Sequence, residues 1–217
     1  MFFHKHPYEP YIKANTEKLI VGTLPPPRFT TGELIKQDVD FCYGSYYNSL
    51  WLYINKIHNL GLDFENTHRA IEQRKNFLIA NKIGVCDIVN SCERDKIDAS
   101  DLGMKNIQLR NLIDYLKQFL NVHTLLFTGG NSKNGPEYFF RKHLKEYNLK
   151  LEVISSDVPR IHQFVLDDRI IKTVSLTSPS GSANRAIGSM ELYKKMKNEK
   201  SKFTTLDFRV LQYINWF

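Results

Sequence analysis

Two widely separated stretches of this chain place small and polar residues directly after apolar runs. The first is Leu19-Ile-Val-Gly22-Thr-Leu-Pro-Pro-Pro27, and the second is Leu176-Thr-Ser-Pro179-Ser-Gly-Ser-Ala-Asn-Arg185. Each apolar run predicts a buried strand, and the glycines and prolines predict an abrupt turn at its end. In an open α/β sheet, ligands bind just beyond the carboxyl ends of the strands. The two stretches therefore predict one candidate site, whereas either stretch alone is also explained as a simple strand-to-loop exit.

Three further side chains could act at the same site. Tyr43 and Asn48 stand in a long polar segment, and Asp87 interrupts the mostly apolar residues 83–89. A carboxylate inside such a run is costly unless it has a partner. No histidine has an evident Ser or Cys partner, and no glycine-rich phosphate loop is present. This inventory fits recognition of a planar polar group, such as a nucleic-acid base, better than phosphoryl or acyl transfer.

Composition limits the class of protein. The net charge is +7, which favours polyanionic partners, most often nucleic acid, although a merely basic soluble protein is the alternative. Three cysteines are too few and too sparse for a disulfide framework and suit a reducing cytoplasm. The seven histidines show no metal-ligand spacing. The N-terminus does not resemble a signal peptide, and no apolar run is long enough to cross a membrane. We therefore expect a cytoplasmic, metal-free, monomeric protein with no membrane contact.

The elements that must position these residues alternate between strand and helix. We expect strands at residues 18–22, 83–89, 122–128, 151–154 and 170–176, and helices near 48–60, 66–81, 105–120, 135–147 and 187–200. Residues 1–17, 90–101 and 157–169 are expected to be irregular, and residues 203–217 to form a packed tail, either helical or extended. The pattern predicts a single α/β domain over residues 1–217, with a mainly parallel sheet of four to five strands covered on both faces. Right-handed crossovers then bring the loops that begin at Gly22, Asp87, Gly129 and Thr177 to one rim.

The order of these motifs resembles that of the uracil-DNA glycosylase superfamily. Gly22-Thr-Leu-Pro25 is similar to the first motif, Tyr43-Gly-Ser-Tyr-Tyr-Asn48-Ser-Leu-Trp51 to the second, and Thr177-Ser-Pro-Ser-Gly-Ser-Ala-Asn184 to a Ser-Pro loop that inserts into the minor groove. Gly84-Val-Cys-Asp87-Ile-Val-Asn-Ser-Cys92-Glu-Arg resembles a stretch of the hypoxanthine-DNA glycosylase branch. Within the superfamily, this chain therefore resembles the hypoxanthine-DNA glycosylase / mismatch-specific branch most. The matches extend from about residue 18 to residue 185. The resemblance implies a three-layer α/β/α sandwich that needs no cofactor.

The resemblance also implies a function, a monofunctional DNA glycosylase that flips out uracil or hypoxanthine and hydrolyses its N-glycosidic bond. Gly22, Pro25, Tyr43 and Asp87 would form the base pocket, with Tyr43 stacking on the base and Asp87 accepting a base N–H. The backbone N–H groups of Thr23 and Leu24 would hold a carbonyl oxygen and the charge that develops on the leaving base. Tyr43 as a core aromatic residue and Asp87 as a carboxylate that caps a neighbouring loop are the structural alternatives.

One position departs from the superfamily pattern. Several branches carry Asp or Asn two residues after the motif glycine to activate or position the attacking water, but this chain has Leu24 there. The hypoxanthine-excising branch also has an apolar residue at that position. Asn48 is therefore expected to position the water, although an amide is a poor general base and Asn48 could simply cap a helix. A catalytically silent nucleic-acid-binding relative and an α/β enzyme acting on free nucleosides or nucleotides are the alternative functions.

The Ser-Pro loop is the expected DNA-binding segment. The resemblance implies that Ser178, Pro179 and Ser180 lie against the DNA backbone and that Gly181 permits close approach. Asn184 and Arg185 would enter or line the minor groove. A Ser- and Gly-rich surface loop is the alternative for this composition. A lysine-rich helix follows the loop, and a solvated basic face is the simpler explanation of its charges.

Overall fold

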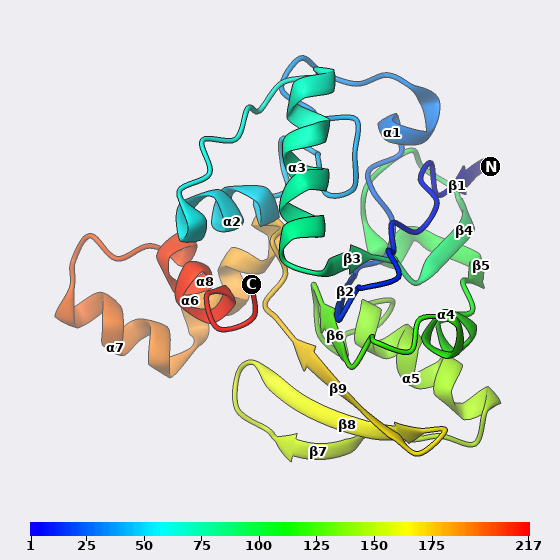
Figure 1. Cartoon of the computed structure of the whole chain (residues 1–217). Helices are drawn as coiled ribbons and strands as arrows, with labels where there is room; N and C mark the ends of the chain where they lie inside the picture. Colours follow the sequence, from blue (N-terminus) through cyan, green and yellow to red (C-terminus); the bar gives the residue numbers. More distant parts are fainter.

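The computed structural model describes residues 1–217, and its centre is a six-stranded sheet in the order β3-β2-β6-β9-β8-β7 (Figure 1). The strands are β2 (Lys18–Val21), β3 (Ile83–Val85), β6 (Thr124–Phe127), β7 (Glu152–Ser155), β8 (Arg160–Leu166) and β9 (Arg169–Ser175). The first three strands of that order and β9 are parallel, whereas β8 and β7 continue the sheet antiparallel. The parallel strands therefore end at one edge, as the sequence predicts.

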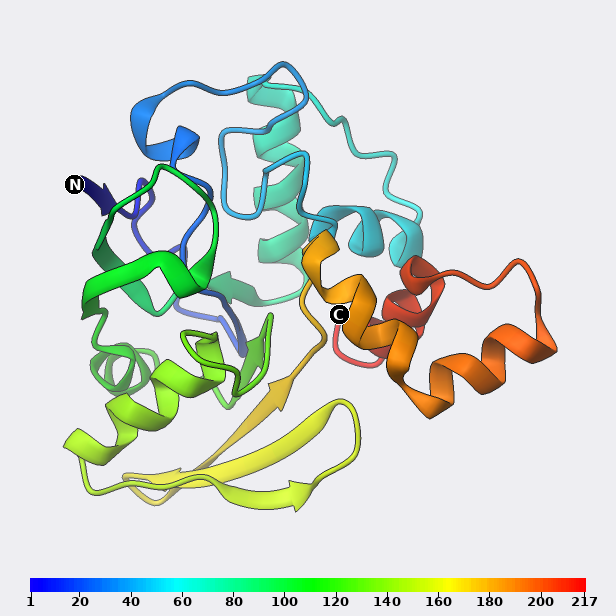
Figure 2. The ribbon, with the colours of Figure 1, turned by 180° about the vertical axis from the view of Figure 1, so that it is seen from behind.

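Helices cover both faces of the sheet. The central strand β2 is buried on both sides, and Leu19 and Val21 pack on one core cluster while Ile20 packs on the other. The first cluster lies under α4 (Leu112–Gln118) and α5 (Pro136–Glu146), and the second lies under α2 (Leu50–His58), α3 (His68–Ala80) and α8 (Thr205–Tyr213) (Figures 1 and 2). Such continuous apolar strands are typical of parallel sheets covered on both faces. The three-layer α/β/α architecture is confirmed.

A second, three-stranded antiparallel sheet was not expected. It is formed by β1 (Phe2–Lys5), β4 (Val89–Arg94) and β5 (Met104–Leu109), in the order β1-β4-β5. The prediction of irregular structure was therefore wrong for residues 2–5 and 90–94. The predicted helix at 105–120 was wrong for residues 105–109, which belong to β5. In β4 the polar side chains of Ser91 and Arg94 are buried. Arg94 is accommodated there because its guanidinium donates to His4 Nδ1 (2.9 Å) and to the carbonyl oxygen of Ser100 (2.6 Å).

Strand β8 occupies residues that we expected to be a loop. It joins β9 through Asp167 and Asp168, whose φ angles are 48° and 61°. Two consecutive positive φ angles match the twist of a two-residue hairpin turn, and Asp tolerates that conformation. His162, Phe164 and Leu166 alternate with more exposed residues, which is the strand period. This hairpin explains why the sheet has six strands rather than four to five.

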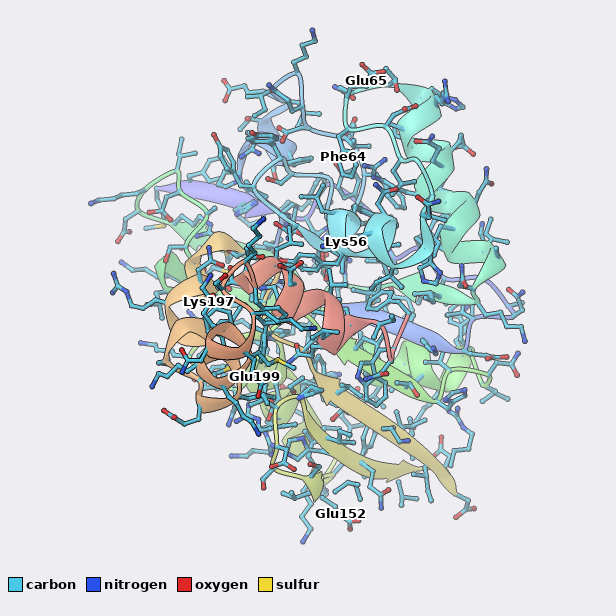
Figure 3. All side chains as sticks on the ribbon, turned by 90° about the vertical axis from the view of Figure 1, so that its left-hand side faces the viewer. Lys56, Phe64, Glu65, Glu152, Lys197 and Glu199 are labelled. Atoms are coloured by element: carbon cyan, nitrogen blue, oxygen red, sulfur yellow. The ribbon has the colours of Figure 1, made fainter.

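The C-terminal part is helical. The expected helix at residues 187–200 is divided into α6 (Asn184–Ser189) and α7 (Glu191–Glu199), because Met190 between them is extended (φ −71°, ψ 130°). Helix α7 has no buried residue and projects from the body of the molecule, at the left of Figure 1 and the right of Figure 2. In Figure 3, Lys197 and Glu199 of this helix lie on the side that faces the viewer. Residues 203–217 contain α8, which pairs with α2 through the 2.7 Å contact between Lys56 Nζ and Asp207 Oδ1. Short helical turns complete the chain: α1 (Arg28–Thr31), η1 (Asp101–Gly103) and η2 (Gly181–Ala183). No helix is sufficiently long and apolar to cross a bilayer.

Candidate base-binding site

The carboxyl ends of the parallel strands open into one cavity of about 930 Å³. The loops after β2, β3, β6 and β9 line it together with parts of residues 42–48 and 99–102. Ten of the residues predicted from the sequence line this cavity: Gly22, Thr23, Leu24, Pro25, Tyr43, Asn48, Asp87, Ser178, Pro179 and Ser180. Gly181, Asn184 and Arg185 do not line it. The tertiary structure thus brings together segments that are more than 150 positions apart.

Asp87 is the polar centre of the cavity floor. Its Oδ1 accepts hydrogen bonds from the backbone N–H of Gly22 (2.7 Å) and from the hydroxyl of Tyr43 (2.6 Å). Its Oδ2 lies 3.0 Å from Nε2 of His6. The backbone N–H of Tyr8 donates to Nδ1 of His6 (3.1 Å), so Nε2 carries the proton that is shared with Asp87. Both oxygens of this buried carboxylate therefore have partners within the protein, an arrangement that favours the loop-anchoring role over contact with a base.

Tyr43 reaches Asp87 through an unusual backbone conformation. Its φ is 59°, in the left-handed region that is uncommon for an aromatic residue. Burial, followed by the charge of Asp87, raises the pKa of the Tyr43 phenol well above its usual value. The hydroxyl therefore remains protonated and donates to Asp87, while the half-buried side chain contributes to the cavity wall. Such a fixed ring is suited to stacking against a planar ligand.

Gly22 is required by close packing. A Cβ atom at this position would collide with the hydroxyl oxygen of Tyr43, and would lie 2.9 Å from Asp87 Oδ1 and 3.0 Å from Thr128 Oγ1. Both distances are shorter than ordinary van der Waals contacts. The first motif glycine therefore allows the loop after β2 to approach the Tyr43–Asp87 pair.

The long segment before α2 is held by a buried ion pair. Arg28 binds Asp38 through Nε (2.7 Å) and Nη2 (2.8 Å), and the backbone N–H groups of Ile35 and Tyr46 also donate to Asp38. Burial alone would raise the pKa of Asp38, but these hydrogen bonds outweigh it and lower the pKa. A carboxylate with this many donors remains ionised and fixes the segment that carries Tyr43 and Asn48.

The second motif and the Ser-Pro loop are directly joined. The backbone N–H of Ser49 donates to the carbonyl oxygen of Pro179 (3.0 Å), and Asn48 and Ser180 form an isolated antiparallel bridge. Oδ1 of Asn48 accepts the backbone N–H of Leu50 (3.0 Å). The N-cap of α2 is Ser49, which makes no side-chain cap hydrogen bond, so Asn48, the residue before it, satisfies the first N–H of the helix. An amide oxygen has a second lone pair, so this contact orients Asn48 and leaves it able to accept from a water molecule.

Helix α8 anchors the Ser-Pro loop from behind. The buried guanidinium of Arg209 donates to the carbonyl oxygens of Ser178 (2.9 Å) and Ser180 (3.0 Å). Gln212 accepts the backbone N–H of Thr177 (2.6 Å), and the hydroxyl of Tyr213 donates to its carbonyl oxygen (2.8 Å). Sequence reasoning missed these three residues. The available signal was Thr204-x-x-Asp207, a capping box that predicts the helix and therefore which residues share a face.

Three expected DNA-binding residues lie on the outer side of the loop. Oδ1 of Asn184 accepts hydrogen bonds from Arg209 Nη1 (2.8 Å) and Thr205 Oγ1 (3.2 Å), so its oxygen supports the loop. Arg185 is exposed at the start of α6, and a Cβ at Gly181 would meet no protein atom within 4 Å. Gly181 and Arg185 are therefore accessible to a large partner, but not to a base inside the cavity.

Asp101 is a cavity residue that sequence reasoning missed. It starts η1, between β4 and β5, and its Oδ1 accepts a hydrogen bond from Thr23 Oγ1 (2.8 Å). Burial raises its pKa above the usual value, although the Thr23 hydrogen bond and the charge of Arg94 oppose that shift. The backbone N–H groups of Thr23 and Leu24 have no acceptor within the protein. No local pattern marks Asp101, because it stands in a segment with several other acidic residues.

Strand β8 contributes a cation to the cavity wall. Arg160 on β8 lines the cavity and donates to Glu137 Oε2 (2.8 Å), which also accepts from the hydroxyl of Ser175 (2.6 Å). Glu137 is fully buried at the start of α5, and its Oε1 accepts from Arg141 (2.8 Å). Arg160 is therefore held in place in the wall. No three His, Cys, Asp or Glu side chains are close enough together to hold a metal ion.

Comparison with known proteins gives a structural likeness. No protein-family model and no curated protein sequence matches this chain. The solution NMR structure of a protein from Methanosarcina acetivorans, described as a "putative Uracil DNA glycosylase", superposes with a TM-score of 0.54 at 16% identity. The two chains share a fold. The superposition covers 96% of this chain and 99% of the other, so the likeness extends over the whole architecture, including the strands that end at the cavity.

Proposed function

We propose that this protein is a DNA glycosylase that excises a deaminated base, uracil or hypoxanthine, as part of base excision repair. One observation carries the proposal. Ser49 and Asn48 contact Pro179 and Ser180 directly, so the second motif and the Ser-Pro loop meet at the cavity that the first motif also lines. The shared fold with a protein described as a uracil DNA glycosylase supports the same function.

The proposed reaction places a flipped base against Tyr43. The free N–H groups of Thr23 and Leu24 would donate to a base carbonyl and to the charge that develops as the base departs. Asn48, oriented by Leu50, would hold the water that attacks the sugar. Asp87 would act by fixing Tyr43 and Gly22. Stacking on an aromatic ring contributes about 1–3 kcal/mol per base, which helps to offset the cost of flipping the base out of the duplex.

The substrate test uses labelled oligonucleotides with one uracil, hypoxanthine or xanthine, both single-stranded and paired. Pure protein is added, and new abasic sites are revealed by alkaline cleavage. We expect cleavage at uracil or hypoxanthine. Because Lys133 also lines the cavity, borohydride trapping is included, and a monofunctional enzyme gives no trapped adduct. Intact strands for every base would contradict the proposal.

Asn48 can be tested by variants that separate capping from catalysis. Asn48→Ala removes both the cap and the amide, whereas Asn48→Ser keeps an oxygen that caps the helix. We expect both variants to lose excision by about 100-fold or more while they bind DNA normally, because positioning a reacting water is worth effects of this order. Single-turnover rates and anisotropy measure the two properties. Normal excision by Asn48→Ser would assign Asn48 a capping role only.

A silent nucleic-acid-binding protein is the second candidate, and Leu24 is the observation that favours it. Such a protein would leave every oligonucleotide intact but bind duplex DNA with an affinity that falls steeply as salt rises. An enzyme acting on free nucleosides would show little salt dependence. The salt series therefore separates these alternatives.

A further inference from the structure

The first motif lacks a carboxylate, but the tertiary structure supplies one next to it. Leu24 occupies the position at which a water-activating group was expected, and Thr23 precedes it. Asp101, which is 78 positions away from Thr23, accepts a hydrogen bond from the Thr23 hydroxyl at 2.8 Å. Asp101, Thr23 and Leu24 all line the cavity. The carboxylate is therefore attached to the motif loop by a neighbouring side chain.

The segment that carries Asp101 is fastened on both sides. Nδ2 of Asn134, in the loop before α5, donates to the carbonyl oxygen of Asp101 (2.9 Å). Nη1 of the buried Arg94 donates to the carbonyl oxygen of Ser100 (2.6 Å). His4 in turn accepts from Nε of Arg94 (2.9 Å). A side chain whose backbone is held at these points is preorganised, as catalysis requires.

One carboxylate oxygen of Asp101 remains open to the cavity. Oδ1 is occupied by Thr23, whereas Oδ2 has no protein donor. This distinguishes Asp101 from Asp87, whose two oxygens both have partners. Among the two acidic residues of the cavity, Asp101 is the one with a free acceptor for a water molecule.

We propose that Asp101 is the general base of the excision reaction. This inference rests on the proposed glycosylase function. The oxygen of a water molecule held by Asn48 forms a bond to C1′ of the sugar, and the C1′–N bond breaks with its electron pair leaving on the base. The water proton is transferred to Oδ2 of Asp101 and is then released to the departing base or to solvent. Leu24 would then be tolerated because the required carboxylate comes from another loop.

The surrounding charges favour such a role. Burial and the neighbouring charge of Asp87 favour the neutral acid, whereas the Thr23 hydroxyl and Arg94 favour the carboxylate, and the pKa of Asp101 is raised overall. Asp98 lies 3.7 Å from Arg94, and Lys133 and Arg160 are the cations of the cavity wall. A raised pKa makes the carboxylate a stronger base. The excision rate should therefore fall as the pH decreases through this raised pKa.

Asp101→Asn tests the inference with little change of shape, because its amide oxygen can still accept from Thr23. We expect the single-turnover excision rate to fall by about 100-fold or more, the acidic limb of the pH profile to disappear, and DNA affinity to be retained or increased. Asp95→Asn is the matched control: it neutralises an exposed carboxylate of the same chain segment that lies outside the cavity and contacts Lys105, and its excision rate should equal that of the wild type.

Thr23→Val provides a second test that leaves the carboxylate intact. Loss of the hydroxyl removes a hydrogen bond that lowers the pKa of Asp101, so the acidic limb should move to higher pH. The assignment of Asp101 as general base would be overturned if Asp101→Asn excised the base at the wild-type rate, or if the acidic limb of the pH profile did not shift in Thr23→Val. Neither result would contradict the proposed glycosylase function. Absence of excision by the wild-type protein on all substrates would overturn the proposed function, and the inference with it.

Discussion

At the residue scale, the site depends on how closely small side chains allow the loops to approach. Gly22, Tyr43 and Asp87 come from three segments and meet with contacts of 2.6 and 2.7 Å. Gly22 and Asp87 follow the paired strands β2 and β3, whereas Tyr43 comes from a different segment and has a left-handed φ. This conformation brings the Tyr43 hydroxyl to Asp87.

Gly22→Ala should disrupt this arrangement. The added Cβ would collide with the Tyr43 hydroxyl, and we expect a loss of about 1–3 kcal/mol in the free energy of unfolding, as for other overpacked sites, together with loss of excision. Urea unfolding and single-turnover assays measure both effects. Adding Tyr43→Phe, which removes the colliding oxygen, should restore part of the stability.

Gly188 is the matched control for that substitution. It lies in α6, and a Cβ there would meet no atom within 4 Å, so Gly188→Ala should stabilise the helix by about 0.5–1 kcal/mol. Equal effects of the two substitutions would show that close packing does not explain Gly22.

At the element scale, α8 determines the position of the Ser-Pro loop. Arg209 contributes three hydrogen bonds to residues 178–184 at 2.8–3.0 Å. The C-terminal segment therefore supports the proposed DNA-binding loop from behind and does not itself line the cavity.

Arg209→Met should affect both folding and binding. It keeps most of the side-chain volume but leaves the half-buried carbonyl groups of Ser178 and Ser180 without these donors, which costs about 1–3 kcal/mol. We expect a lower unfolding midpoint in urea and weaker binding to duplex DNA by anisotropy. Arg185→Met serves as the comparison, since Arg185 is exposed. Arg185→Met should reduce DNA affinity and its salt dependence without changing the free energy of unfolding. If Arg209→Met also left the free energy of unfolding unchanged, α8 would not be what holds the Ser-Pro loop in position.

At the scale of the whole molecule, a buried histidine–arginine pair inside the three-stranded sheet makes folding dependent on pH. His4 on β1 accepts a hydrogen bond from Arg94 on β4, and its Nε2 is buried without a partner. Burial, together with Arg94 and His6, lowers the pKa of His4 to about 4. The small sheet therefore requires a neutral histidine.

This histidine predicts a loss of stability in weak acid. Its folded-state pKa lies below the unfolded value of about 6.5, so its contribution is complete above that pH and is lost as the pH falls toward about 4. We expect the free energy of unfolding to decrease over this interval by an amount on the order of 3 kcal/mol at most. Urea unfolding at several pH values measures it. His4→Gln should flatten the decrease, whereas His68→Gln, which alters an exposed histidine, should leave it unchanged.

The sequence alone determined the α/β architecture and most of the cavity. Apolar runs such as Leu19-Ile-Val21 are buried on both faces of the sheet. When such runs alternate with segments of helical periodicity, a parallel sheet covered by helices is one of the few folds that can bury them. The loops after these strands must then meet at one edge. The same local patterns misled where polar groups were satisfied far away in the chain, as in β4, or where a turn was made by Asp167 and Asp168, in β8.

Only the tertiary structure decided which partner each polar group has. Asp87 interrupts an apolar run and Asp101 stands in a polar, acidic segment. In the folded protein both oxygens of Asp87 have partners, whereas one oxygen of Asp101 is free. The backbone of Asn48 and the side chain of Arg209 also acquire their positions from contacts with the Ser-Pro loop. Hydrophobic periodicity is a local property that a sequence displays directly. A hydrogen bond between residues 78 positions apart, such as that of Thr23 with Asp101, depends on side-chain geometry that exists only after the chain has packed.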